Sequence, residues 1–250
     1  MEDKSKSKSR NEAQEEIEYY IEVNELKPHD RLPSERELSE IFNLNRSTLR
    51  GAIQKLIEEG KIYKEAGVGN YVAEPKMVRN LNMMDSLTKF VESHQKTIKS
   101  KVLSANIIEC NKQITKNLKI PLGTEVFQLT RLRYVDNVPV SIETSFLNYE
   151  KFPGIEAKDF EIQSLYHVME NEYGAEIIKG KEKLGLTFAT SDEAQRLEIE
   201  IEEPIFFISG VTTDNEDNPV EYFRSVVRPD KIKFSSVLKK EQDKIVEGEN

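Results

Sequence analysis

Between residues 11 and 59, apolar side chains recur every three or four positions, which is the spacing that gathers them on one face of an α-helix. The pattern is interrupted twice, so it predicts three helices, over 11–24, 34–42 and 46–59. The buried face that we predict for these helices consists of Ala13, Ile17, Tyr20, Ile21, Leu38, Ile41, Phe42, Leu49, Ile53, Leu56 and Ile57.

The ends of the predicted helices carry recognisable signals. Ser34 and Glu37 have the spacing of a capping box, in which each side chain accepts a hydrogen bond from the other residue's backbone N–H. Asn45 is a favourable N-cap for the third helix. Beyond that helix, residues 61–72 have the pattern of two short strands around a turn at 67–69. Two helices joined by a tight turn and followed by a hairpin predict a winged helix-turn-helix.

The third predicted helix has a small, polar and basic face opposite its apolar one. Ser47, Arg50 and Gln54 lie on this face, and Arg46 lies in the first turn. A recognition helix presents such a face to base edges in the major groove, where arginine can pair with guanine through two hydrogen bonds. The same pattern also fits the solvated face of an ordinary helical hairpin.

After residue 86 the pattern changes to strands joined by short turns, with helices between them. We predict strands over 100–109, 125–135, 139–147, 175–188, 204–213 and 219–228, and helices over 112–118, 164–173 and 191–197, the last with Ser191 as its cap. Hairpin connections join antiparallel neighbours, so this part is expected to be an antiparallel sheet with helices packed on it. The chain is therefore predicted to be an α+β protein of two domains.

The same changes of pattern divide the chain into five segments. Residues 1–10 are of low complexity and rich in lysine and serine, so we expect a disordered tail. The predicted order is then a winged helix-turn-helix domain over 11–75, a linker over 76–85, a second domain over 86–238 and a charged tail over 239–250.

Composition limits the environment and the chemistry of the chain. No apolar run approaches the ~20 residues of a membrane span, and no apolar stretch follows the basic N-terminus as in a secretory signal, so we expect a cytoplasmic protein without a membrane partner. The single cysteine, Cys110, excludes an internal disulfide, and no Cys/His cluster indicates a metal, so no cofactor is expected.

The net charge of −9 argues weakly against a nucleic-acid partner, because phosphate binding depends on basic surface. The local distribution changes this assessment. Between Ile41 and Ile57 there is no acidic residue, whereas Arg46, Arg50 and Lys55 are present. A locally positive contact surface is therefore compatible with an acidic protein.

The first domain resembles the DNA-binding domain of the GntR family of bacterial transcription regulators. The resemblance rests on the segment LKPHDRLPSERELSEIFNLNRSTLRGAIQKLIEEGKIY and extends almost without gaps from Ile17 to Val72. It implies that residues matching the family's operator contacts bind double-stranded DNA; these are Arg36, Arg46, Ser47, Thr48, Arg50 and Gly67. Val68 stands where family members commonly have a basic residue, which weakens the expectation that the wing enters the minor groove.

The strand over 125–135 carries two arginines on one apolar face. If residues 136–138 form the turn, Arg131 lies opposite Glu143 and Arg133 opposite Ser141 on the next strand. Two arginines beside a carboxylate and a hydroxyl can bind an anion, because arginine contacts phosphate or carboxylate through two hydrogen bonds. The alternative is a ladder of ion pairs on the solvent face of the sheet.

The second domain resembles the UTRA effector domain of the HutC subgroup of GntR regulators, a fold shared with chorismate lyase. The resemblance covers residues 86–237 and rests on IPLGTEVFQLTRLRYVDNVPVSIETSFL, SLYHVMENEYG and NPVEYFRSVVRPD. It implies an effector pocket for phosphosugars, lined at the matching positions by Arg131, Arg133, Glu143, Ser164, Tyr166 and Glu221. Ser164 would open a helix there, which favours a phosphate. Val227 stands where sugar-phosphate binders often have tyrosine, so the sugar end of the pocket can differ.

These resemblances together imply a homodimeric repressor. Paired recognition helices would bind a palindromic operator, and a small anionic effector would bind one arrangement of the domains better and release the operator. Three other hypotheses remain open at this point: an effector that is a carboxylate metabolite, a lyase-like enzyme, and a structural DNA-binding protein without a ligand. Against an enzyme, the three histidines, His29, His94 and His167, fit no catalytic arrangement.

Overall fold

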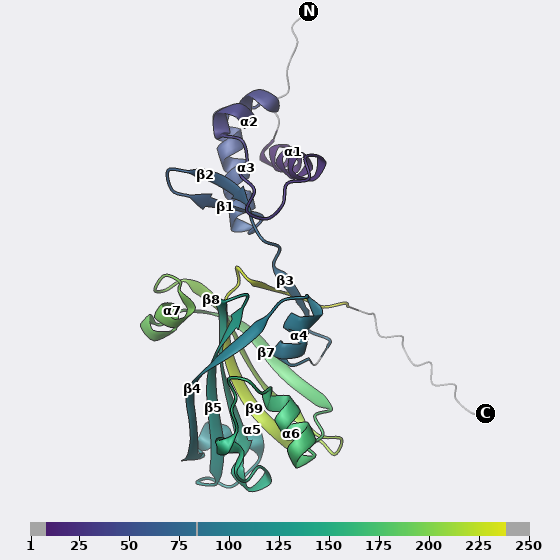
Figure 1. Ribbon diagram of the computed structural model, residues 1–250, viewed down its shortest axis with the longest axis vertical. Coiled ribbons are helices and arrows are strands. Elements are labelled where there is room, and N and C mark those ends of the chain that lie inside the picture. The colour runs from purple at the N-terminus through teal and green to yellow at the C-terminus, as the bar shows by residue number, and fades with distance from the viewer. Residues whose placement is uncertain (1–8, 84, 239–250) are drawn as a thin grey trace, which may run out of the picture. The chain divides into compact units, whose positions relative to one another are not determined.

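The computed structural model describes residues 9–83 and 85–238, and these fall into two compact units that divide between Lys76 and Met77 (Figure 1). The two tails predicted over 1–10 and 239–250 lie outside the described residues except for Ser9 and Arg10. Arg10 begins the first helix and Ser9 caps it, so this helix starts one residue before the predicted domain boundary at Asn11.

The first unit has the predicted winged helix-turn-helix order. Its elements are α1 (Arg10–Val23), α2 (Glu35–Ile41), α3 (Arg46–Glu58), β1 (Ile62–Glu65) and β2 (Gly69–Val72). Both predicted caps are confirmed. Ser34 and Glu37 form a reciprocal capping box, and the Asn45 side chain accepts a hydrogen bond from the backbone N–H of Thr48 at 2.8 Å. The α2–α3 turn is therefore fixed by side chains that satisfy the exposed N–H groups of both helices.

The apolar faces of the three helices form one core, in which Ile17, Leu38, Leu49 and Leu56 are completely buried. One predicted core position is wrong, because Ile41 is 54% exposed. Helix α2 ends at this residue, and the next apolar side chain, Phe42, packs against the core in its place. The β1–β2 hairpin closes the unit with Ile62 opposite Val72, and Gly67 takes the positive φ that its turn requires.

The second unit is built on a six-stranded sheet in the order β4-β5-β6-β9-β8-β7, with every neighbouring pair antiparallel. The strands are β4 (Ile98–Glu109), β5 (Glu125–Val135), β6 (Val138–Asn148), β7 (Lys179–Phe188), β8 (Pro204–Thr213) and β9 (Pro219–Val227). The predicted antiparallel α+β class is confirmed. The predicted strand over 175–188 is shorter than expected, because residues 175–178 precede it without strand pairing.

Helices cover both faces of this sheet (Figure 1). On one face, α4 (Leu87–Ser93) and α6 (Leu165–Tyr173) pack against residues such as Phe127 and Val135; on the other, α5 (Lys112–Leu118) and α7 (Ser191–Leu197) pack against Val126 and Leu132. Helix α7 has its predicted range but a different cap, since Thr190 and Glu193 form its capping box. Two short 3-10 helices, Tyr149–Lys151 and Ile155–Ala157, follow β6.

The predicted linker differs from the structure. Residues 77–80 form β3 (Met77–Asn80), which pairs in parallel with β10 (Ile232–Ser235) near the other end of the chain. Met77 and Ile232 are buried against α4 and the sheet, which holds this ribbon on the second unit. A four-residue strand paired with a partner more than 150 positions away leaves no periodic signal in the sequence.

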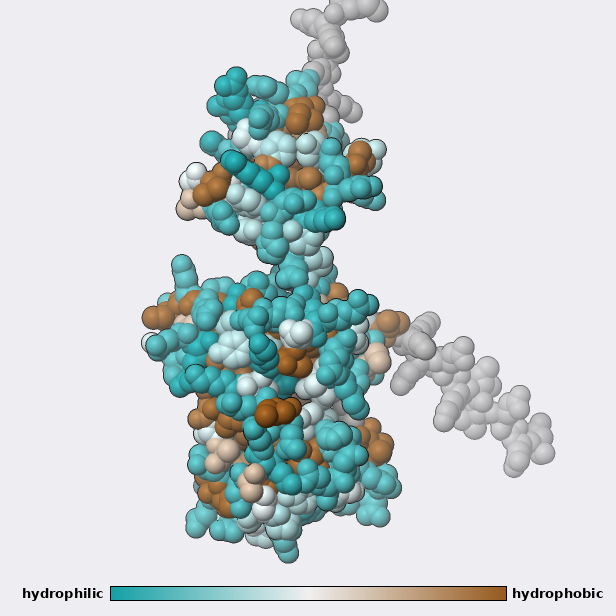
Figure 2. All heavy atoms as spheres, in the orientation of Figure 1, coloured by the Kyte–Doolittle hydropathy of each residue, from teal (hydrophilic) through white to brown (hydrophobic). Residues whose placement is uncertain are grey.

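The surface of the second unit is mostly hydrophilic, with separate apolar patches (Figure 2). One group of apolar side chains lies on the edge strand β7, where Leu184, Leu186 and Phe188 are all exposed and share one face. Within the described ranges, we find no helix with both the length and the apolar character needed to cross a bilayer.

Candidate functional site

The predicted DNA contacts lie on and around α3. Arg46, Ser47 and Arg50 are exposed, and Thr48 is half-buried. A groove in this unit is lined by Arg36, Arg46, Arg50 and Gly67, whereas Ser47 and Thr48 do not line it. The structure therefore brings four of the six predicted residues to one concave surface.

Sequence reasoning missed two further cations in this groove, Arg31 and Lys64. The Arg31 guanidinium donates a hydrogen bond to the Val68 carbonyl at 2.6 Å and so ties the wing to the segment before α2. Five cationic side chains and only two carboxylates, Glu35 and Glu65, line the groove, which gives it a positive balance on an acidic protein. This balance favours contact with the phosphate backbone.

Arg50 has an ion-pair partner in the same unit. Its Nε donates to the Glu35 carboxylate at 2.7 Å, and this hydrogen bond raises the pKa of Arg50. The Arg50 side chain is nevertheless 68% exposed, so water screens the pair strongly. Glu35 orients Arg50 in the free protein, and a base or phosphate can replace it.

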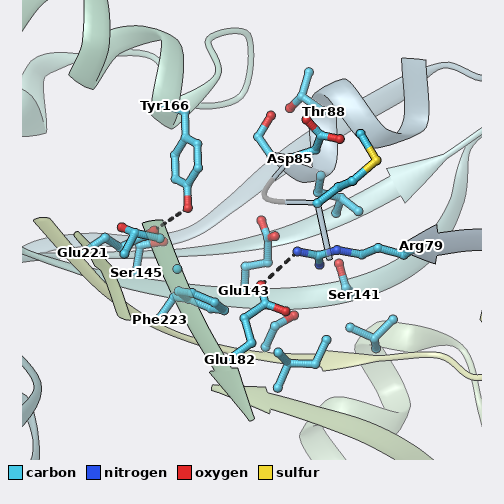
Figure 3. A pocket seen from close by; sticks show the side chains of 18 of the residues that line it. Arg79, Asp85, Thr88, Ser141, Glu143, Ser145, Tyr166, Glu182, Glu221 and Phe223 are labelled. Atoms are coloured by element: carbon cyan, nitrogen blue, oxygen red, sulfur yellow. Dashed lines mark hydrogen bonds and ion pairs between the residues drawn. The ribbon is translucent and has the colours of Figure 1, made fainter. Parts of the chain in front are cut away.

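All six predicted effector residues line one cavity of about 530 Å³ in the second unit. Three of them, Glu143, Tyr166 and Glu221, are labelled in Figure 3. Arg131 and Arg133 enter from β5, Glu143 from β6, Glu221 from β9, and Ser164 and Tyr166 from the start of α6. Residues separated by up to 90 positions in the chain therefore meet in one place. Ser164 is the N-cap of α6, yet its side chain makes no capping hydrogen bond with that helix.

The predicted pairing of the two arginines is observed, but it arises in a different way. Arg131 lies opposite Glu143 and Arg133 opposite Ser141. The turn contains only Asp136 and Asn137, both with positive φ, instead of three residues. A β-bulge on β6, between the partners of Arg133 and Tyr134, adds the missing residue and restores the predicted register.

The arginine pair is buried, which excludes the alternative of a solvent-exposed ladder. Arg131 and Arg133 are 5% and 3% exposed, because α4 and α6 cover this face of the sheet. Both arginines contact one oxygen of Glu143, at 3.3 Å from Arg131 and 3.1 Å from Arg133. Arg133 also donates to the Thr88 hydroxyl at 2.9 Å.

The charges of this cluster are not balanced locally. One carboxylate serves two guanidinium groups, and burial together with the neighbouring Arg133 lowers the pKa of Arg131 to about 10. Burial alone would raise the pKa of Glu143, but the charges of Arg133, Arg131 and Arg79 outweigh it and hold that pKa below its ordinary value. Taken by themselves, Arg131, Arg133 and Glu143 carry two positive charges and one negative charge, so a bound anion could serve as a second partner for the guanidinium groups.

Several buried polar atoms at this cavity have no protein partner. They are the Nε atoms of Arg131 and Arg133 and the hydroxyls of Ser141 and Thr212, all on residues that line it. An unsatisfied buried polar group costs about 1–3 kcal/mol, so their concentration at one cavity points to a bound polar ligand or ordered water as their partner.

A second group of polar side chains in the cavity surrounds Glu221 of β9. The Tyr166 hydroxyl donates to Glu221 at 2.8 Å, and Ser145 also hydrogen-bonds this carboxylate (Figure 3). Burial raises the pKa of Glu221, and burial together with the Glu221 charge raises the pKa of Tyr166 well above its usual range. The Glu221 carboxylate can accept hydrogen bonds from ligand hydroxyls, and the Tyr166 hydroxyl can donate or accept them. Val227 lies beside this cavity and is buried.

Sequence reasoning missed part of the cavity wall. Thr212 lines it, as do Arg79, Asp85, Thr88, Glu182 and Phe223 (Figure 3). Arg79 and Asp85 fall in the segment predicted as a linker, and no local signal marks the others. Phe223 lies so close to β8 that a Cβ at Gly210 would stand 2.6 Å from its ring, which explains a glycine in the middle of that strand.

Comparison with known families gives two matches that together span most of the chain. Residues 93–233 match the UTRA domain, and residues 9–72 match the family described as bacterial regulatory proteins, gntR family. The two matches correspond in order to the second and first units of the structure.

Similar whole proteins cover both units at once. The HTH-type transcriptional repressor NagR of Bacillus subtilis is 30% identical over 88% of this chain and 90% of its own. The probable fructoselysine utilization operon transcriptional repressor of Escherichia coli K12 is 29% identical over 81% of this chain and 83% of its own. The crystal structure of PhnF from Mycobacterium smegmatis shares the fold, with a TM-score of 0.67, 24% identity and coverage of 92% of this chain and all of that one.

Proposed function

Because the chain belongs to the GntR family of bacterial regulatory proteins and carries a UTRA domain, we propose that it represses transcription from a palindromic operator and is released by a small anionic effector, a sugar phosphate. The observation that carries this proposal is the buried pair Arg131 and Arg133, whose Nε atoms have no protein partner at a cavity. The predicted resemblance to GntR regulators of the HutC subgroup is confirmed.

The enzyme hypothesis is not retained. Both matched families are regulator domains, and the similar curated proteins are named as transcriptional repressors. The chain is therefore a regulator and not an enzyme, although its second unit was expected to share the fold of a lyase.

Two groups of polar side chains in the cavity support a ligand with two different parts. Arg131, Arg133 and the Ser141 and Ser164 hydroxyls offer donors to a phosphate, which carries more charge and more acceptor oxygens than a carboxylate. Glu221 and Tyr166 offer acceptors and donors to sugar hydroxyls. A similar protein named for fructoselysine utilization is compatible with a sugar-derived effector.

The DNA-binding part of the proposal assigns Arg46, Ser47, Thr48 and Arg50 to base edges and adjacent phosphates in the major groove. Arg36 and the Gly67 backbone would contact phosphates on either side. The exposed Val68 at the wing tip has no charge, so we propose a weaker wing contact than a basic residue would give.

A palindromic operator requires a second copy of the chain. We assign the dimer contact to the second unit, where the edge strand β7 exposes Leu184, Leu186 and Phe188 on one face. An exposed apolar edge strand pairs readily with another strand. Two β7 strands related by a twofold axis would run antiparallel, and their free backbone N–H and C=O groups would hydrogen-bond to each other. Sedimentation of the full chain and of Leu186→Asp tests this contact, because the variant should be monomeric.

The decisive experiment is thermal unfolding of the full chain against hexose 6-phosphates, hexosamine 6-phosphates and small carboxylates. A ligand at about 100 times its dissociation constant stabilises the folded state by roughly 2.7 kcal/mol, which gives a clear rise in melting temperature. We expect one sugar phosphate to raise the melting temperature of the wild type and not that of Arg131→Ala.

Two further variants make the result specific. Arg196→Ala removes an arginine that is ion-paired to Asp192 on α7, on the opposite face of the sheet, and should respond like the wild type. Arg131→Lys keeps the buried charge and loses the two-point contact. Stabilisation by carboxylates alone would favour the carboxylate hypothesis, and equal stabilisation of wild type and Arg131→Ala would place the ligand elsewhere.

A further inference from the structure

A third arginine reaches the effector cavity from outside the six-stranded sheet. Arg79 lies on β3, paired with Phe234 of β10 in the two-stranded ribbon. Its side chain extends into the cavity (Figure 3), where its Nη2 donates to the Glu182 carboxylate of β7 at 3.0 Å. Arg79 is 18% exposed and Glu182 is 26% exposed at the side chain, so the pair sits at the cavity's margin rather than on open surface.

Arg79 differs from the other two arginines in how firmly it is held. Arg131 and Arg133 project from a central strand of the sheet and share Glu143. Arg79 projects from a four-residue strand, and its ion-pair partner Glu182 lies on the edge strand β7. A partly exposed side chain on a short ribbon can change its partner at a lower cost than one buried in the sheet.

The charge of Arg79 already acts at the centre of the cavity. Together with Arg133 and Arg131 it lowers the pKa of Glu143, and it also opposes the rise in the pKa of Tyr166. An anion bound beside the Arg131–Arg133 pair would therefore attract Arg79 as well. Glu182 would compete with that anion for the same guanidinium.

We propose that Arg79 is a third anion-binding arginine of the cavity, and that Glu182 is the partner it leaves when an anionic effector binds. This inference rests on the proposed function of the cavity. It adds Arg79 to the effector-binding residues, together with the exchange of its partner Glu182 for the effector. Strand β3 begins at Met77, directly after the first unit, whose last strand ends at Val72. Ligand binding would thus act on the segment that follows the DNA-binding unit directly.

This exchange predicts opposite effects of the two partners on anion affinity. We would titrate the full chain with inorganic phosphate at constant ionic strength and follow its melting temperature. Arg79→Gln should weaken phosphate binding about 10-fold, as expected for the loss of one charged hydrogen bond. Glu182→Gln should strengthen it by roughly 3-fold, because a competing carboxylate is removed while its shape is kept. The double variant should bind like Arg79→Gln alone.

A purely structural ion pair gives a different result. Both single variants would then change phosphate affinity in the same direction, or not at all, and either outcome overturns the proposal. Arg196→Gln is the matched control, since it breaks an arginine–carboxylate pair on the other face of the sheet and should leave phosphate binding unchanged.

Failure of the underlying function has its own signature. Arg131→Gln is the reference variant for it: if the wild type shows no saturable phosphate binding, or binds no better than Arg131→Gln, the cavity is not an anion site and the proposed function fails. If Arg131→Gln weakens binding while Arg79→Gln does not, the proposed function stands and only the role of Arg79 is overturned.

Hydrogen exchange of the β3 amides tests the consequence for the segment after the DNA-binding unit. Saturating phosphate should change exchange at residues 77–80 in the wild type and leave it unchanged in Arg79→Gln. The same change in both proteins would mean that Arg79 does not carry the effect to β3.

Discussion

The two units hold their arginines in opposite ways. In the first unit, Arg36 and Arg50 are mostly exposed; the partner of Arg36, Glu40, is exposed as well, and the partner of Arg50, Glu35, is partly exposed. In the second, Arg131 and Arg133 are almost completely buried and share one carboxylate. The same side chain is thus kept adaptable where we propose that it contacts DNA, and it is held in fixed geometry where we propose that it binds a small effector.

The difference has an energetic basis. Exposed ion pairs are screened by water and salt and contribute little to stability, so losing one on DNA binding costs little. Buried charges are expensive to leave unpaired, so their positions must be fixed and compensated before a ligand arrives. Three predictions test this contrast, beginning with the largest expected effect.

Removing the shared carboxylate should destabilise the second unit strongly. Glu143→Gln leaves two buried guanidinium groups without an anionic partner, and breaking a buried pair typically costs about 3–5 kcal/mol. Because the Glu143 side chain is 23% exposed, we expect a loss of about 2 kcal/mol in the free energy of unfolding, measured by urea denaturation of the full chain. Added phosphate should restore part of it.

The matched change in the first unit is Glu35→Gln, which removes the partner of the exposed Arg50. It should leave the urea midpoint unchanged. If the two variants lost the same stability, the contrast between exposed and buried arginines would be wrong.

The second prediction concerns operator binding. Arg50→Ala should reduce affinity for the operator roughly 5- to 150-fold if Arg50 pairs with guanine through two hydrogen bonds, and should relax the preference at that base pair. Arg36→Ala, which is assigned to a phosphate, should weaken binding to all sequences alike and reduce its salt dependence. Binding of both variants to the operator and to scrambled DNA, measured at two salt concentrations, separates the two roles. A uniform loss in Arg50→Ala would assign Arg50 to a phosphate as well.

The contrast also explains what could be predicted from sequence. The first unit was almost fully predictable, because capping residues such as Ser34 and Asn45 and the helical apolar pattern are local signals. The exception is Ile41, the last residue of α2. Helical periodicity no longer applies beyond a helix end, so the exact end position determines whether Ile41 or Phe42 packs inward.

In the second unit, local signals gave the strands but not the complete site. Alternation along β5 placed Arg131 and Arg133 on one face, and their partners followed from the hairpin. The bulge that sets the register, and the short turn that it compensates, have no marker in the sequence. Arg79 and Glu182 meet across 103 positions through pairing of β3 with β10, and contacts of that range depend on the whole fold.

The smallest predicted effect concerns pH, and it sharpens the comparison. In the first unit the pKa values of Glu37 and Glu59 are both lowered, by hydrogen bonds from Ser34 and Gln14 respectively. In the cavity the two carboxylates move in opposite directions: the pKa of Glu221 is raised, mainly by burial, whereas the arginines lower that of Glu143 against the effect of burial.

The signs of the stability changes follow from these directions. Glu221 binds its proton more tightly in the folded state, so its contribution is fully present below its unfolded pKa, near 4.5, and is lost as pH rises through the folded value. Replacing it with glutamine, which does not titrate, should make the protein more stable relative to wild type at about pH 7 than at about pH 4. Glu143 has the opposite sign, since its contribution to stability is present above its unfolded pKa, near 4.5, and is lost as pH falls through the folded value. The stability that Glu143→Gln loses relative to wild type should therefore be larger at about pH 7 than at about pH 4. Urea midpoints of the three proteins across this range measure both slopes. If relative stability changed with pH in the same direction for both variants, burial alone, and not the arginine pair, would set the pKa values of Glu143 and Glu221.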